Sequence, residues 1–167
     1  MNFPKRIHII GSTGSGKTYL AERLSKKYKL IYGELDTVMW SGTEEFSCKN
    51  SSETRDRLLH NIIEQDKWVV EGVYYKWLTP SFHRAELIIY LDTKLCIRAV
   101  RIILRYIKQR LGLERSIYNQ TLKGLIKMLE WNQKFERDNK YKILEFIEPY
   151  KSKVIIIKNS KEIEELL

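Results

Sequence analysis

The chain has 167 residues, of which 43% are hydrophobic, and its formal net charge is +9 at pH 7. These values predict a single globular domain over residues 1–167, and no apolar run reaches the roughly 20 residues that a helical membrane span needs. Cys48 and Cys96 lack the spacing of metal ligands. Because the start of the chain also leaves no room for a signal peptide, we expect a cytoplasmic protein with two free thiols.

The basic character of the chain predicts an anionic partner, but the sign of the charge does not separate a nucleotide from nucleic acid or acidic lipid. The lysines and arginines are spread out, with no run of five or six. This spacing argues against a disordered DNA-binding arm and fits a folded protein that handles polyphosphates.

The first predicted element is a buried strand over residues 6–10, which leads into a glycine-rich motif and then into a helix with Leu20, Leu24 and Tyr28 on one face. The motif fits the phosphate-loop pattern at every fixed position. Its eight residues are Gly11, Ser12, Thr13, Gly14, Ser15, Gly16, Lys17 and Thr18. A strand before the motif and a helix after it are the context that this loop requires, and a chance turn would lack it.

The chemistry of such a loop follows from its backbone. Glycines let successive N–H groups point at one anion, and the helix N-terminus adds further N–H groups and the positive end of its dipole. Lys17 can reach the β- and γ-phosphates of a nucleotide, and the Thr18 hydroxyl can take a position on Mg²⁺. ATP and Mg²⁺ are therefore the predicted cofactors.

The rest of the chain alternates strand-like and helical patterns, which predicts an α/β fold with a parallel sheet. The predicted strands cover residues 30–35, 68–71, 87–91 and 154–157. Helices are predicted over about 53–65, from an N-cap at Thr93 to Leu111 with Gly112 as the stop, and over about 116–147 with a break near Asp138. The polar stretch 40–52 is predicted to be a mobile loop.

Carboxylates follow three of the predicted strands, at the edge where ligands bind in parallel sheets. Glu71 either holds Mg²⁺ or orients the attacking group, or is a solvated acid at a strand end. Asp36 either accepts a proton from a substrate hydroxyl or ligates the metal, or caps a short helix. Asp92 has the position of a second metal-binding acid, although its place before a helix favours a structural role.

The predicted helix from Thr93 to Leu111 carries an apolar stripe that includes Cys96, which we expect in the core. The stripe is Cys96, Val100, Ile103, Ile107 and Leu111. Opposite it lie Arg98, Arg101, Arg105 and Lys108 without acidic partners. A solvated face is one explanation of these cations. The other, which we favour, is that at least Arg101 or Arg105 contacts polyphosphate, with Arg137 as a weaker candidate.

These residues resemble the small P-loop kinases, the group that includes adenylate kinases. They are more closely similar to the DNA topology modulation proteins, which share that fold. The shared stretches are residues 35–40, 68–74 and 84–92, with Trp131 and Phe135 in the last long helix. Two departures are visible. The chain has Glu71-Gly72-Val73-Tyr74 where the family usually has Asp-Gly-Asn-Tyr, and its lid segment around Gly112 is short.

The resemblance implies a three-layer P-loop NTPase fold with a five-stranded parallel sheet of order 2-3-1-4-5, helices on both faces and a short helical lid at about 106–124. It also implies that Arg101 and Arg105 lie against the nucleotide and that Asn159 and Ser160 lie near the adenine-side loop.

The resulting hypothesis is a phosphotransferase that moves the γ-phosphoryl group of ATP to a small acceptor such as a nucleotide. Lys17, Arg101 and Arg105 would neutralise charge. Thr18 and Glu71 would hold Mg²⁺, and Asp36 would interact with the hydroxyl group of the acceptor. The alternatives are a nucleotide-dependent DNA-binding ATPase and a slow ATPase or nucleotide sensor. The expected assembly is a monomer or a homodimer.

Overall fold

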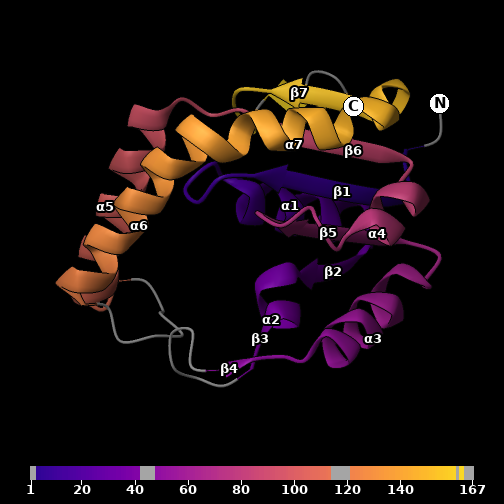
Figure 1. The fold of residues 1–167 in the computed structure, drawn as a ribbon, viewed down its shortest axis with the longest axis horizontal. Helices are drawn as coiled ribbons and strands as arrows, with labels where there is room; N and C mark the ends of the chain where they lie inside the picture. The colour runs from indigo at the N-terminus through magenta and orange to yellow at the C-terminus, as the bar shows by residue number, and fades with distance from the viewer. Residues whose placement is uncertain (1–2, 42–47, 114–120, 161, 164–167) are drawn as a thin grey trace.

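The computed structural model describes residues 3–41, 48–113, 121–160 and 162–163, and a five-stranded parallel sheet forms its centre (Figure 1). The strands are β1 (Arg6–Gly11), β2 (Ile31–Glu34), β5 (Trp68–Gly72), β6 (Leu87–Leu91) and β7 (Val154–Ile157). They are arranged as β2-β5-β1-β6-β7, with every neighbouring pair parallel. This arrangement confirms the predicted order 2-3-1-4-5.

Helices cover both faces of the sheet, as predicted for a three-layer fold (Figure 1). They are α1 (Lys17–Tyr28), α2 (Leu35–Met39), α3 (Ser52–Ile63), α4 (Thr79–Arg84), α5 (Leu95–Arg110), α6 (Leu122–Lys134) and α7 (Lys140–Ile147), with a π-helix η1 (Phe135–Asn139) and a 3₁₀-helix η2 (Glu148–Lys153). Side chains of β1 alternate between two cores. Ile7 and Ile9 pack with α1, whereas Ile10 packs with α3, α4 and α7.

The predicted element limits hold closely outside the loops. The expected break near Asp138 is a π-helical turn that joins α6 to α7 without interruption. Within the predicted loop over 40–52, β3 (Trp40–Ser41) and β4 (Cys48–Lys49) pair antiparallel, and residues 42–47 lie outside the described residues. The predicted lid at 106–124 includes residues 114–120, which also lie outside them. No helix in the described part of the chain is long and apolar enough to cross a membrane.

The start of α5 differs from the prediction. Its N-cap residue is Lys94, not Thr93. The Thr93 hydroxyl lies within hydrogen-bond distance of two carbonyl oxygens, that of Ser15 at 3.1 Å and that of Lys158 at 3.0 Å. Thr93 therefore ties the phosphate loop to the end of β7 instead of capping a helix.

The predicted buried stripe of α5 is wrong, because the helix turns its other side to the protein. Val100 is 54% exposed, Leu111 is 67% exposed and Cys96 is also exposed. The residues of α5 that are buried are Arg98 and Ile102. The phosphate loop is the physical reason, since it packs against these two residues and leaves the apolar stripe facing outward.

His8 lies on the central strand β1 and is fully buried. Its Nδ1 lies 2.9 Å from the Ser81 hydroxyl, and its ring stacks on Phe82. Burial lowers the pKa of His8 from its ordinary value of 6.5 to about 3. The folded protein therefore holds this imidazole neutral at pH values where the unfolded chain protonates it.

His8→Gln should make the protein less sensitive to acid. Below pH 6.5 His8 binds a proton in the unfolded chain but stays neutral in the folded chain. The free energy of unfolding of the wild type therefore falls as the pH drops towards 3. Between pH 7 and pH 5 the wild type should lose about 2 kcal/mol more than the variant. Urea unfolding at several pH values measures this difference, with the exposed His60→Gln as the control. If the free energy of unfolding falls equally with decreasing pH in the wild type and in His8→Gln, His8 does not have the lowered pKa.

Candidate active site

The phosphate loop joins β1 to α1 through two glycines in left-handed backbone conformations. Gly14 has φ of 76° and Gly16, the N-cap residue of α1, has φ of 99°. A Cβ on Gly14 would also lie only 2.8 Å from the carbonyl oxygen of Arg98. Both positions therefore require glycine, and α1 begins at Lys17 with no side chain capping its first turn.

Two cations approach the loop, as the sequence predicted. The Lys17 side chain is buried and its Nζ donates to the carbonyl oxygen of Ser12 at 3.0 Å. Arg101, on α5, donates from Nη1 to the carbonyl oxygens of Ser15 at 2.9 Å and Gly14 at 3.3 Å. The structure thus brings Arg101 to the loop, with its guanidinium beside the turn that precedes α1.

The predicted metal-binding pair is also brought together. Thr18 Oγ1 donates to Glu71 Oε1 at 2.7 Å, and Lys17 Nζ lies 4.0 Å from Glu71 Oε2. Pairing of β1 with β5 aligns Ile10 with Gly72, which sets the end of β5 beside the loop. Glu71 is only 3% exposed, so the reading of a solvated strand-end acid is wrong. Tyr32, on β2, donates a further hydrogen bond to Glu71 at 3.3 Å.

The donor set fits Mg²⁺. One hydroxyl and one carboxylate, both oxygen donors, face the loop where phosphate oxygens would complete a coordination shell. Among the described residues no group of three or more histidine, cysteine, aspartate or glutamate side chains could hold a metal. The hydroxyl and the carboxylate suit Mg²⁺, which is usually held by one or two protein groups together with phosphates and water.

These groups open into one cavity of about 460 Å³. Its lining includes Ser12, Thr13, Lys17 and Thr18 of the phosphate loop, together with Asp36 and Glu71. The other lining residues are Trp40, Val73, Tyr74, Met128, Trp131, Lys134, Phe135 and Asn139. The cavity therefore joins the phosphate loop, the predicted metal pair and Asp36 to an apolar compartment formed mainly by aromatic rings.

Asp36 lies in the first turn of α2, exposed and on the wall of this cavity. The alternative reading of Asp36 as a helix cap is wrong, because the N-cap residue of α2 is Glu34 and no side chain caps that helix. The carboxylate of Asp36 is thus available to a molecule in the cavity.

The remaining predicted residues lie further from the cavity wall. Arg105 is exposed on α5. Asn159, which is exposed, and Ser160, which is half-buried, follow β7 next to Lys158, which Thr93 ties to the phosphate loop. This places their turn close to the loop but shows no contact with a nucleotide.

Two other candidates have structural partners. Asp92 forms an ion pair of 2.7 Å with Lys140, so it ties the segment after β6 to the start of α7, and the residue that caps α5 is Lys94. Arg137 pairs with Asp138 at 3.0 Å, and its side chain is 77% exposed. Neither Asp92 nor Arg137 lines the cavity.

Sequence reasoning missed several residues of the site. Lys134 and Asn139 line the cavity from α6 and η1, and Glu34 lies beside its acids. Burial, followed by the carboxylates of Glu71 and Asp36, raises the pKa of Glu34 to about 7. The spacing of Met128, Trp131 and Phe135 on one helix face was the signal that could have revealed this wall.

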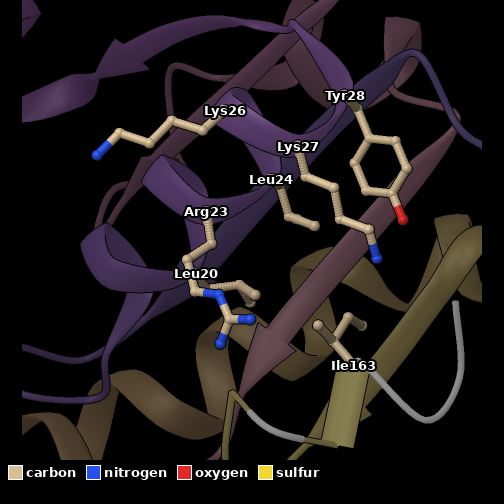
Figure 2. A pocket seen from close by; sticks show the side chains of 7 residues that line it. All are labelled: Leu20, Arg23, Leu24, Lys26, Lys27, Tyr28 and Ile163. Atoms are coloured by element: carbon tan, nitrogen blue, oxygen red, sulfur yellow. The ribbon is translucent and has the colours of Figure 1, made fainter.

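A second pocket of about 380 Å³ lies beside α1 (Figure 2). Leu20 and Leu24 of α1 point towards Ile163 in it, and basic side chains surround them. None of the predicted site residues lines this pocket, so it is separate from the candidate active site.

A comparison with models of protein families identifies the family of the chain. A family model described as AAA domain matches residues 7–120, more than half of the sequence. The chain belongs to this AAA domain family. Together with the phosphate loop, membership of the AAA domain family makes the protein a P-loop kinase or ATPase. Among curated proteins, no match to the chain was found.

Solved structures of small-molecule kinases match the chain at low identity. A shikimate kinase from Bacteroides thetaiotaomicron matches with 18% identity and a TM-score of 0.49, covering 95% of this chain and 88% of its own. A gluconokinase from Sinorhizobium meliloti 1021 matches with 14% identity and a TM-score of 0.49, over 79% and 76%. A shikimate kinase from Aquifex aeolicus matches with 18% identity and a TM-score of 0.47, over 77% and 80%.

Glu34→Gln should stabilise this AAA domain protein at neutral and higher pH. The raised pKa means that the folded state holds a proton that the unfolded state releases above pH 4.5, so wild-type stability falls as the pH rises from 4.5 through about 7. Glu34 is partly exposed, and solvent screening limits the gain to at most about 1 kcal/mol at pH 8. Urea unfolding at pH 4.5, 6 and 8 measures it, with the exposed Glu130→Gln as the control. If the free energies of unfolding of the wild type and of Glu34→Gln change in parallel with pH, the pKa of Glu34 is not raised in the folded protein.

Proposed function

We propose that the protein is a Mg·ATP-dependent phosphotransferase that moves the γ-phosphoryl group of ATP to a hydroxyl group of a small acceptor. The observation that supports this function best is that the phosphate loop, the Thr18–Glu71 pair and Asp36 line one cavity with an apolar compartment. A nucleotide hydrolase needs only the phosphate loop and the Thr18–Glu71 pair. Asp36 and the apolar compartment suit a second substrate.

The proposed nucleotide contacts begin at the loop. Its backbone N–H groups and Lys17 would hold the β- and γ-phosphates, and Arg101 is already within hydrogen-bond distance of the loop carbonyls. Arg105 would face the same phosphates from the next turn of α5. Asn159 and Ser160 would border the base, from the turn that Thr93 ties to the loop.

The proposed metal ligands are the Thr18 hydroxyl and the Glu71 carboxylate. When bound there, Mg²⁺ would neutralise charge on the β- and γ-phosphate oxygens. Glu71 is buried and near Lys17, which fixes its carboxylate in one orientation.

Asp36 is the proposed general base. Its carboxylate would accept the hydroxyl proton of the acceptor as the acceptor oxygen bonds to the γ-phosphorus and ADP leaves. Nucleotides, which the sequence suggested as acceptors, are one class in the panel that tests this function. The closer likeness to DNA topology modulation proteins stays a prediction from the sequence.

Lys17→Met should weaken ATP binding by at least about tenfold, since it removes a charge-assisted hydrogen-bond donor from the phosphates. Isothermal titration calorimetry with Mg·ATP gives the Kd of each variant. Lys26→Met, on an exposed face of the same helix, is the matched control and should bind like the wild type. If Lys17→Met binds ATP as tightly as Lys26→Met, the loop is not the nucleotide site.

Asp36→Asn should slow phosphoryl transfer by about 10²- to 10⁴-fold while the Kd for ATP stays within about twofold, because only the proton acceptor is lost. The assay incubates the enzyme with γ-labelled ATP, Mg²⁺ and a panel of nucleosides, nucleotides, sugars and hydroxy acids, and follows labelled organic product. Asp66→Asn, at an exposed loop acid, is the control. Label recovered only as inorganic phosphate would assign the protein to ATP hydrolysis and overturn the proposed function.

A further inference from the structure

The compartment beyond the phosphate loop is walled by aromatic rings from two directions. Trp40 and Tyr74 come from the segments that follow α2 and β5, and Trp131 and Phe135 come from α6 and η1. All four line the same cavity. A molecule that reaches from this compartment to the γ-phosphate would therefore pass between aromatic side chains.

Contacts of their own side chains hold residues of both walls in place. Trp40 Nε1 donates a hydrogen bond of 3.0 Å to the Tyr74 hydroxyl, which joins the two segments of one wall. In the other wall, Phe135 is 4% exposed, and the guanidinium of Arg98 lies 5.2 Å from the centre of its ring. Such fixed rings present flat surfaces at low entropic cost, which favours stacking against a planar ligand.

The charges that line the compartment are few and balanced. Beyond the Lys17, Thr18 and Glu71 groups assigned to ATP and Mg²⁺, the charged side chains among the described lining residues are Asp36 and Lys134. No arginine is among those lining residues. An acceptor that already carries a phosphate would need several cations or arginine forks to offset its charge. The lining therefore matches an uncharged acceptor.

The polar groups of the compartment are also few. Asp36, Lys134, Asn139 and the Tyr74 hydroxyl share it with the aromatic rings and with the apolar side chains of Val73 and Met128. A polyhydroxylated sugar would leave many of its hydroxyl groups facing apolar atoms, which is costly. A nucleoside carries fewer hydroxyl groups than a hexose and offers a flat ring to the apolar surfaces.

On the basis of the phosphotransferase function proposed above, we propose that the acceptor is a neutral alcohol that carries a flat aromatic ring, as a nucleoside does. The ring stacks in the aromatic compartment and the hydroxyl group faces Asp36. The hydroxyl oxygen bonds to the γ-phosphorus of ATP, the bond from that phosphorus to the β,γ-bridging oxygen breaks, and ADP leaves. The hydroxyl proton passes to the Asp36 carboxylate, and the product is the phosphate monoester of the alcohol.

A paired-substrate assay tests this acceptor class. The probes are adenosine, cytidine and thymidine, their three 5′-monophosphates, and glucose and glycerol as alcohols without an aromatic ring. With γ-labelled ATP and Mg²⁺, at least one nucleoside should be labelled ten times faster than its own monophosphate and than either ringless alcohol.

The failures of this inference and of the proposed function are distinguishable. Faster labelling of a monophosphate, glucose or glycerol overturns the neutral aromatic acceptor and leaves the phosphotransferase standing. ATP binding with label released only as inorganic phosphate overturns both. Weak ATP binding that Lys17→Met does not change overturns the site itself.

Trp131 supplies the second arm of the test. Its side chain is 38% exposed, so truncation should leave the fold intact. Trp131→Ala should raise the KM for the labelled nucleoside by about tenfold, the loss expected for one stacking partner, and change the KM for ATP by less than about twofold. Trp131→Phe should restore most of the affinity, and Tyr141→Ala, at an exposed aromatic residue of α7, is the control. An unchanged nucleoside KM in Trp131→Ala would overturn the stacking role.

Discussion

The close packing of the phosphate loop against α5 is the constraint on which the rest of the site depends. Gly14 has no room for a side chain, because the backbone of α5 at Arg98 approaches it so closely. The carbonyl of Ser15 is held by hydrogen bonds from Thr93 and Arg101, just before and within the same helix. The loop and α5 therefore form one rigid unit. Since α6 packs beside α5, the position of the aromatic wall follows from the position of the loop (Figure 1).

Arg98 extends this unit to the π-helical turn. It is fully buried, pairs with Glu136 at 2.6 Å and lies against the ring of Phe135, while its Nε and Nη1 have no partner among the described residues. A buried ion pair of this kind adds little net stability, because the desolvation of both charges offsets their attraction. What the pair does provide is a fixed register between α5 and η1. The π-helical turn in turn directs Phe135 and Asn139 to the same cavity, a use of such turns that is frequent at functional sites.

The sequence predicted the parts of the site that are local in the chain. The loop, Lys17 and Thr18 could be predicted because the strand, the motif and the helix that form them follow one another in the chain. The position of Glu71 beside the loop depends on the strand order, which the resemblance implied. Hydrophobic periodicity found the apolar stripe of α5 but assigned it to the wrong side, because periodicity describes a helix without saying what the helix packs against. The pairing of Asp92 with Lys140, and the presence of Trp40 and Trp131 on the wall of one cavity, bring together residues far apart in the sequence. Only the tertiary fold determines such contacts.

The electrostatics of the cavity connect the two substrates of the proposed reaction. Burial, followed by repulsion from the carboxylates of Glu71 and Asp36, raises the pKa of Glu34, and Lys17 Nζ lies 4.0 Å from Glu71 Oε2. In the proposed reaction a free triphosphate would add to this repulsion, whereas Mg²⁺ held by Thr18 and Glu71 would offset it. Among the described lining residues, Asp36 would then be the carboxylate left to face the acceptor. An anionic acceptor would meet that carboxylate and the γ-phosphate at once, so the same acids that favour a metal-bound nucleotide also favour an uncharged partner for it.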